Sequence, residues 1–183
     1  MNPEPTAVPL FQCLLGSSFD TLPAPIRQLH DARTRKVFAG SCRIERGSHW
    51  LVPLFALVMS LPKSGDDLPV EIMIESADGK ETWARNFAGQ PMRSVLSERN
   101  GQLEERLGPM RFRFALKVED QAIVWTLAGV KLLGLLPLPV AWFRGVVARE
   151  SAAKSDRYRF DVRAALPLVG PLIHYDGWLS VDP

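Results

Sequence analysis

The sequence predicts an α+β domain in which a curled, mostly antiparallel sheet of about eight or nine strands wraps around one main helix, with short helices at the N-terminus. After about residue 66, apolar and polar side chains alternate along successive short segments. This is the period of strands that have one covered face and one wet face. The segments follow one another through turns without crossover helices, which makes neighbouring strands antiparallel. Helical periodicity is confined to the N-terminal third of the chain.

The N-terminal third contains the predicted helices. Residues 1–9 carry three prolines and no periodicity, so we expect a flexible lead-in before a single domain over residues 10–183. Two short helices and a first strand are then predicted, over residues 10–15, 22–31 and 37–45. Residues 48–61 repeat apolar side chains at helical spacing, which predicts the main core helix. A long sheet twists, and we expect it to curl around this helix.

The rest of the chain is predicted to form strands. The clearest covers residues 111–119, and Asp78-Gly79 predicts a hairpin turn. The other segments share the same alternation between turn signals and cover residues 70–75, 81–87, 92–98, 102–107, 121–130, 143–150, 157–163 and 172–181. The large side chains expected to line the inner face of the sheet are Phe112, Phe114, Leu116, Trp125, Phe143, Tyr158 and Phe160.

One apolar segment, residues 122–143, is long enough to cross a bilayer as a helix. Lys131 lies near its centre, where a charge is costly, and glycines and prolines interrupt any regular helix. We therefore predict no membrane span. Instead, we predict that this segment forms a strand over residues 121–130, a turn-rich connector over 132–139 and another strand from Val140.

Composition and charge are those of a soluble globular protein. Of the 183 residues, 46% are hydrophobic and 23% charged, and 22 Lys and Arg against 20 Asp and Glu leave a net charge of +2. This balance argues against nucleic acid or an anionic membrane as the main partner. Cys13 and Cys42 lie in apolar stretches without CxxC spacing, which favours buried free thiols. Because the N-terminus lacks a signal-peptide pattern, we expect a cytoplasmic location.

An arginine between two aromatic residues is the most unusual feature. If Trp83, Arg85 and Phe87 share the covered face of a strand, the guanidinium needs a carboxylate, and the candidates are Glu104 and Glu105. One interpretation is a structural ion pair or a cation–π contact at an exposed edge. Another is an anchor for an anion or polar headgroup inside an apolar cavity, and a third is a catalytic role.

A second polar cluster lies near the C-terminus. On a strand, His174, Asp176 and Trp178 share one face, and a histidine beside an aspartate can act as an oriented base. Side chains two residues apart on a strand are about 7 Å apart, however, which favours a structural role. His30 and His49 stand alone in the sequence and are expected to be capped or half-buried.

Several chemistries are excluded by their missing signatures. There is no GxSxG elbow, P-loop, GxGxxG or HExxH, and the scattered histidines and cysteines have no metal-ligand spacing. Glu104 and Glu105 are adjacent, so they face opposite ways on a strand and cannot form a glycosidase pair. We expect no cofactor and no metal, and we assign no catalytic residue.

Spaced residues along nearly the whole chain resemble the bacterial domain-of-unknown-function family 4166. They are Phe11, Leu14-Leu15-Gly16, Leu22-Pro23, Leu29-His30, Gly40, Arg46-Gly47, Trp83, Arg85, Phe87, Glu104, Leu107-Gly108, Pro167-Leu168, Gly170, Tyr175 and Gly177-Trp178-Leu179. The resemblance implies that Arg85 and the Glu104 region belong to the family pattern. It also implies a possible NAD-binding reductase-like partner, because some members of the family are fused behind such a domain. No dinucleotide fingerprint is present here, so no cofactor is carried over.

The first functional hypothesis is a binding module, with an apolar pocket between sheet and helix for a lipid-like or other apolar small molecule. The candidate ligand-binding residues are Arg85, Trp83, Glu104, Tyr175 and His174. The second hypothesis is an enzyme that acts with a reductase on a small apolar anionic substrate. In that case Arg85 would bind the anion while Glu104, Glu105 or His174 moved protons. The third is a protein-interaction domain.

Overall fold

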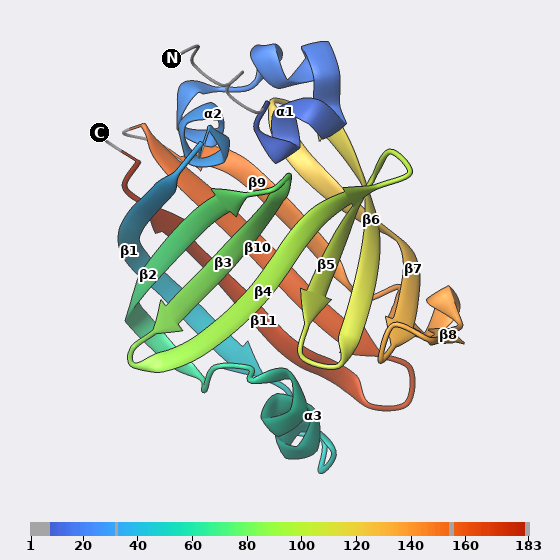
Figure 1. The fold of residues 1–183 in the computed structure, drawn as a ribbon. Coiled ribbons are helices and arrows are strands. Elements are labelled where there is room, and N and C mark those ends of the chain that lie inside the picture. Colours follow the sequence, from blue (N-terminus) through green and yellow to red (C-terminus); the bar gives the residue numbers. More distant parts are fainter. Residues whose placement is uncertain (1–7, 32, 154–155, 182–183) are drawn as a thin grey trace.

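The computed structural model of the chain describes residues 8–31, 33–153 and 156–181. The lead-in predicted over residues 1–9 lies outside the described residues, apart from Val8 and Pro9. Within the described residues, ten antiparallel strands form a ring (Figure 1). Its members are β1 (Arg35–Arg46), β2 (Gly65–Ala77), β3 (Lys80–Phe87), β4 (Gln90–Arg99), β5 (Gln102–Leu107), β6 (Met110–Glu119), β7 (Ala122–Leu132), β9 (Val147–Ala153), β10 (Arg157–Leu166) and β11 (Gly170–Leu179).

Two pairings complete the closed barrel, one between strands far apart in the chain and one between the two strands of a hairpin. β1 pairs with β11 along seven residue pairs, and β6 pairs with β7 along its whole length. The order around the ring is β6-β5-β4-β3-β2-β1-β11-β10-β9-β7, which returns to β6. Closure leaves the ring strands without a free edge. A further short strand, β8 (Leu136–Leu138), pairs with β7 alone.

The predicted sheet wrapped around a main helix is wrong. The helix predicted over residues 48–61 exists only as α3 (Val52–Met59), which lies across one end of the barrel (Figure 1). Only Val52 and Ala56 of α3 are buried, and Leu57 is 80% exposed. The apolar residues of this segment surround the helix instead of forming one stripe, so they cannot all pack on a core. The sheet closes on itself and encloses its own side chains instead.

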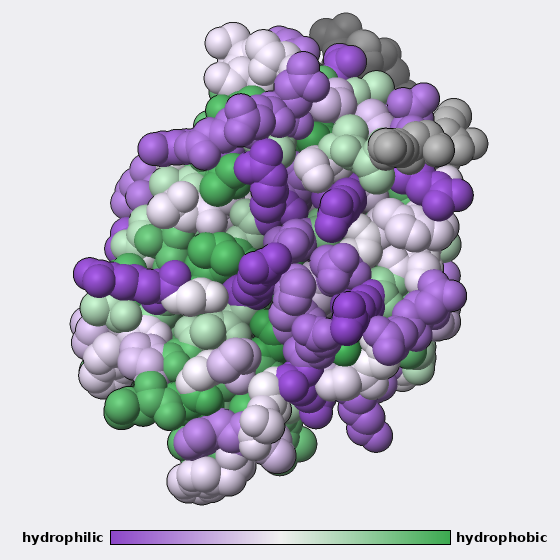
Figure 2. All heavy atoms as spheres, turned by 180° about the vertical axis from the view of Figure 1, so that it is seen from behind, coloured by the Kyte–Doolittle hydropathy of each residue, from purple (hydrophilic) through white to green (hydrophobic). Residues whose placement is uncertain are grey.

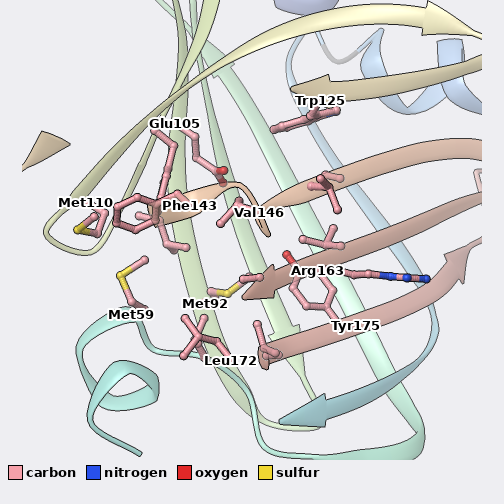
Figure 3. A pocket seen from close by; sticks show the side chains of 18 of the residues that line it. Met59, Met92, Glu105, Met110, Trp125, Phe143, Val146, Arg163, Leu172 and Tyr175 are labelled. Atoms are coloured by element: carbon pink, nitrogen blue, oxygen red, sulfur yellow. The ribbon is translucent and has the colours of Figure 1, made fainter. Parts of the chain in front are cut away.

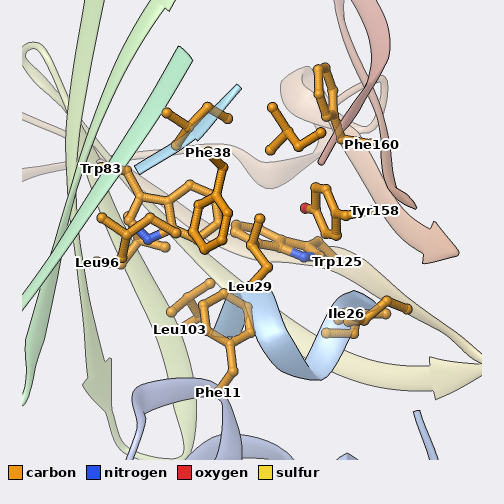
Figure 4. Close-up of a cluster of buried hydrophobic side chains, with 14 of the residues drawn as sticks. Phe11, Ile26, Leu29, Phe38, Trp83, Leu96, Leu103, Trp125, Tyr158 and Phe160 are labelled. Carbon is orange, nitrogen blue, oxygen red and sulfur yellow. The ribbon is translucent and has the colours of Figure 1, made fainter. Parts of the chain in front are cut away.

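The short N-terminal helices are present as predicted, and they close the opposite end of the barrel. They are α1 (Leu10–Leu15), the 3-10 helix η1 (Gly16–Thr21) and α2 (Ala24–His30). Phe11, Ile26 and Leu29 are fully buried, and they join a cluster of side chains from several strands, among them Leu96 and Leu103 (Figure 4). This end of the barrel is therefore solidly packed, and we call it the plugged end.

The chain between β7 and β9 differs from the prediction. Residues 140–143 form a 3-10 helix, η2 (Val140–Phe143), instead of a strand, and β9 begins at Val147. Pro137 and Pro139 cannot donate ladder hydrogen bonds, which limits β8 to three residues. Among the described residues, no helix has the length and apolar character needed to cross a bilayer.

Candidate functional site

The lower part of the barrel, between the plugged end and α3, is hollow. It encloses a cavity of about 440 Å³, a size that suits a small-molecule ligand (Figure 3). Six of the seven side chains predicted to line the inner face also line this cavity, and they are Phe112, Phe114, Trp125, Phe143, Tyr158 and Phe160. The seventh, Leu116, lies beside Leu14 and Leu15 near the plugged end. Met92, Met110 and Met59 add flexible side chains to the wall.

Arg85 points into this cavity from β3. Strand alternation places Trp83, Arg85 and Phe87 on the inner face, and all three are buried. The Arg85 Nη1 atom donates a hydrogen bond to the Ser94 hydroxyl at 2.9 Å, and Nη2 lies 3.5 Å from the Glu105 carboxylate. The guanidinium carbon lies 4.9 Å from the centre of the Trp83 ring, within cation–π range. The charge of Arg85 is therefore balanced inside the barrel, and its partner is Glu105.

Two tyrosines share the inner face with Arg85. Tyr175 of β11 and Tyr158 of β10 both line the cavity. Burial raises the pKa of Tyr175 to about 12, against the opposing effect of Arg85. Burial, reinforced by Glu150, raises the pKa of Tyr158 well above its ordinary value. Both side chains thus present neutral hydroxyl groups at physiological pH. The Trp125 indole N–H, also on the wall, is buried and has no hydrogen-bond partner within the described chain.

A buried acid–histidine pair lies between the cavity and the plugged end. His30 Nε2 is 2.6 Å from the Glu150 carboxylate, and both side chains are buried. Close by, Glu81 accepts a hydrogen bond from the Trp83 indole at 2.9 Å. Burial is the main cause that raises the pKa of Glu81 above its ordinary value of 4.5, with Glu150 adding to it. Sequence reasoning missed this pair, because His30 and Glu150 are 120 residues apart.

The structure does not bring Glu104 or His174 to the cavity. Glu104 lies on the outer surface, 3.7 Å from the Arg99 guanidinium and 3.8 Å from that of Arg111. His174 Nε2 lies 3.3 Å from Asp161 and 3.9 Å from Asp176, also on the outer surface. Of the five candidate ligand-binding residues, Arg85, Trp83 and Tyr175 line the cavity.

The described residues offer no donor set for a metal or a dinucleotide. Nowhere in residues 8–31, 33–153 and 156–181 do three histidine, cysteine or acidic side chains gather as potential metal ligands. The cavity wall is mainly aliphatic and aromatic, and it lacks the glycine-rich turn before a helix that holds a pyrophosphate. The arrangement is suited to enclosing an apolar molecule that has a small polar end.

The fold and the cavity define a class: a closed antiparallel β-barrel with a hollow, apolar interior and one buried, balanced arginine. The chain itself belongs to the family described as Domain of unknown function (DUF4166), whose profile matches residues 22–179. The predicted family resemblance is thereby confirmed. No curated protein matches the chain significantly.

Proposed function

We propose that this domain binds one lipid-like small molecule inside the barrel, with the apolar body of the ligand toward α3 and an uncharged polar end at Arg85. The observation that carries the proposal is the hollow lower barrel, about 440 Å³ in volume and walled by large apolar side chains. Well-packed interiors rarely leave voids larger than a water molecule. Barrels of similar strand number, such as lipocalins, hold a single small ligand, although this likeness is an analogy of fold.

The polar groups of the cavity favour an uncharged oxygen on the ligand. A guanidinium has five N–H donors, and the contacts of Arg85 with Ser94 and Glu105 involve two of its nitrogens. The Trp125 N–H adds another donor that has no partner within the described chain. Because Glu105 already balances the charge of Arg85, a carboxylate on the ligand would add a buried negative charge that no cation neutralises. A hydroxyl or carbonyl oxygen could accept these hydrogen bonds without that cost.

The other functional hypotheses keep less support. Of the three residues proposed to move protons, Glu104 and His174 lie on the outer surface, away from a bound substrate. The third, Glu105, lines the cavity, where it is paired with Arg85. A reductase-like partner remains a prediction from the family. The cytoplasmic location also remains a prediction.

The two cysteines differ from each other in burial. Cys42 is a buried free thiol, and burial raises its pKa to about 11. Cys13 was also predicted to be buried, but it is exposed.

A fluorescence titration tests the binding proposal. Nile red, an uncharged apolar dye, should bind the purified chain, and a long-chain primary alcohol should displace it better than the carboxylate or amine of the same length. Ala164 lines the cavity, so Ala164→Phe should abolish dye binding; Ala148→Phe provides a second filling variant. Ala39 is exposed on β1, so Ala39→Phe is the matched control and should bind normally. Equal dye binding by all the variants would refute an internal site.

A further inference from the structure

The end of the barrel that carries α3 has an exposed apolar surface around the cavity, which we call the apolar rim. Its residues come from the α3 segment, the β7–β9 connection and the β10–β11 turn, and they are Trp50, Leu54, Leu57, Val58, Leu133, Leu135, Leu136, Val140, Trp142 and Leu168. Among the described residues, the exposed large hydrophobic side chains outside the rim are Val8, Val37 and Val147. Figure 2 shows hydrophobic side chains gathered over the lower part of the molecule, the end that carries α3 in Figure 1.

The rim is continuous with the cavity. Leu54 and Val58 are exposed, yet they also line the cavity from α3. Two tryptophans stand on separate segments of the rim, with Trp50 78% exposed and Trp142 54% exposed. Indole rings prefer the boundary between lipid headgroups and hydrocarbon, because one edge is polar and the faces are apolar. Exposed aliphatic side chains beside such tryptophans are typical of surfaces that enter a lipid interface.

Charge at this end of the barrel has one sign. The five connections there, residues 47–64, 88–89, 108–109, 133–146 and 167–169, contain Lys63 and Arg144 and no aspartate or glutamate. Both cations are exposed and have no ion-pair partner within the described chain. Glu45 and Asp66, the nearest acids on either side of the 47–64 connection, both pair with Arg43. Asp67, at the start of β2, accepts a hydrogen bond from the Ser41 hydroxyl.

The helices and turns at the plugged end carry charges of both signs with acids in excess. Among the described residues, these charges are Asp20, Asp31, Asp78, Asp120 and Asp156 against Arg27 and Arg33. The small net charge of the whole chain therefore hides a polarity between the two ends. An expectation based on total charge alone would miss a local attraction to anions.

We propose that the apolar rim docks on the surface of an anionic phospholipid bilayer, with the indoles and leucines entering the interface and Lys63 and Arg144 facing lipid phosphates. The two cations favour an anionic lipid surface, because lipid phosphates would attract them. They disfavour a second copy of this chain, because its rim would place the same two cations opposite them. In this orientation the cavity faces the bilayer. Docking itself does not depend on a ligand in the cavity, whereas exchange of a ligand with the bilayer rests on the proposed function.

Vesicle sedimentation tests the docking. The full chain should sediment with vesicles of phosphatidylcholine and phosphatidylglycerol, and much less with phosphatidylcholine alone. The pair Lys63→Gln and Arg144→Gln should weaken the partition coefficient about 30-fold, since each cation near an anionic surface is worth about 1 kcal/mol. The pair Leu57→Glu and Trp142→Glu should abolish sedimentation. Val37→Glu and Lys80→Gln, at the plugged end, are the matched controls and should sediment like the wild type.

Three results would overturn the proposal: no sedimentation with anionic vesicles, equal sedimentation by the rim and control variants, or a stable dimer that Leu57→Glu dissociates. The dimer would assign the rim to a second copy of the chain. Nile red binding separates this proposal from the proposed function. The rim variants should still bind the dye in solution, whereas Ala164→Phe should lose the dye and still sediment.

Discussion

At the scale of single residues, the charge of Arg85 inside the hollow barrel is paired with a carboxylate. The guanidinium of Arg85 faces an apolar cavity, where Glu105 of β5 compensates its charge and Ser94 of β4 accepts a hydrogen bond from it. A buried ion pair contributes little net stability compared with apolar side chains of similar volume, but removal of one partner leaves the other charge unpaired. This asymmetry gives a clear prediction.

Arg85→Met should lower the free energy of unfolding by about 3 kcal/mol, because Glu105 is left without its cation. The double variant Arg85→Met, Glu105→Leu should return to within about 1 kcal/mol of the wild type, since neither charge then remains. Arg111→Met breaks a partly exposed pair with Glu104 and should cost less than about 1 kcal/mol. Urea denaturation measures all three. A double variant no more stable than the single one would contradict the pairing.

The buried carboxyl of Glu81 predicts a dependence of stability on pH. Burial is the main cause that raises its folded-state pKa, so the folded chain holds this proton more tightly than the unfolded chain does. Stability is therefore lost as the pH rises from the ordinary value of 4.5 through the raised pKa. Glu81→Gln cannot ionise and should gain stability relative to the wild type over that range. Urea denaturation from pH 4.5 upward measures the difference; a difference that stays constant or shrinks would contradict the prediction.

Part of the polar interior could be predicted from the sequence. Alternation along β3 predicts that Arg85 shares a face with two aromatic residues and needs a nearby carboxylate. The same alternation in β5 distinguishes Glu105, between Leu103 and Leu107, from its outward neighbour Glu104. The pair of His30 and Glu150 could not be predicted in this way, because it joins α2 to β9 through tertiary packing. An acid in the inward register of β9 was its only local signal.

At the scale of elements, the first and last strands of the ring are held together through glycines. Gly177 of β11 pairs with Cys42 of β1, and Gly40 of β1 pairs with Leu179. A Cβ atom at Gly177 would lie 2.6 Å from the Cys42 Cβ atom, and one at Gly40 would lie 2.9 Å from the Leu179 Cα atom. Both glycines belong to the residues that carry the family resemblance. Their presence is explained by the close approach of β1 to β11, and not by a ligand site.

Gly177→Ala should therefore lower the free energy of unfolding by about 2–3 kcal/mol, because the obstructing atoms include β1 backbone that cannot rotate away. Ala39→Val, at an exposed position of β1, is the control and should change stability by less than about 0.5 kcal/mol. Thermal or urea unfolding of both variants provides the comparison. A Gly177→Ala protein as stable as the wild type would show that the two strands are less closely packed.

The strand predictions were accurate where turn chemistry is explicit. Asp78-Gly79 and Asn100-Gly101 both adopt positive φ, as two-residue hairpins require, and β5 has the predicted bounds. The segment around α3 was misjudged because apolar spacing indicates that a helix forms but not what covers it. Residues 140–143 were misjudged because a short run of apolar residues after a proline can belong to a strand or to a 3-10 helix.

At the scale of the whole molecule, the barrel has two unlike ends. Helices α1 and α2 fill one end with buried side chains, whereas the other end is hollow and carries α3 and the apolar rim. The sequence predicts the antiparallel strands but not their closure. Closure depends on the tilt and stagger of strands and on pairing between β1 and β11, which are more than 120 residues apart in the chain. The hollow follows from closure, because no helix occupies the lower interior.

Native mass spectrometry of the chain incubated with a long-chain primary alcohol tests the central claim most directly. The account predicts one bound alcohol per chain for the wild type and for Ala39→Phe, and none for Ala164→Phe, whose added ring occupies the cavity. No adduct on the wild type, or the same adducts on all three proteins, would contradict the claim that the barrel holds a ligand inside.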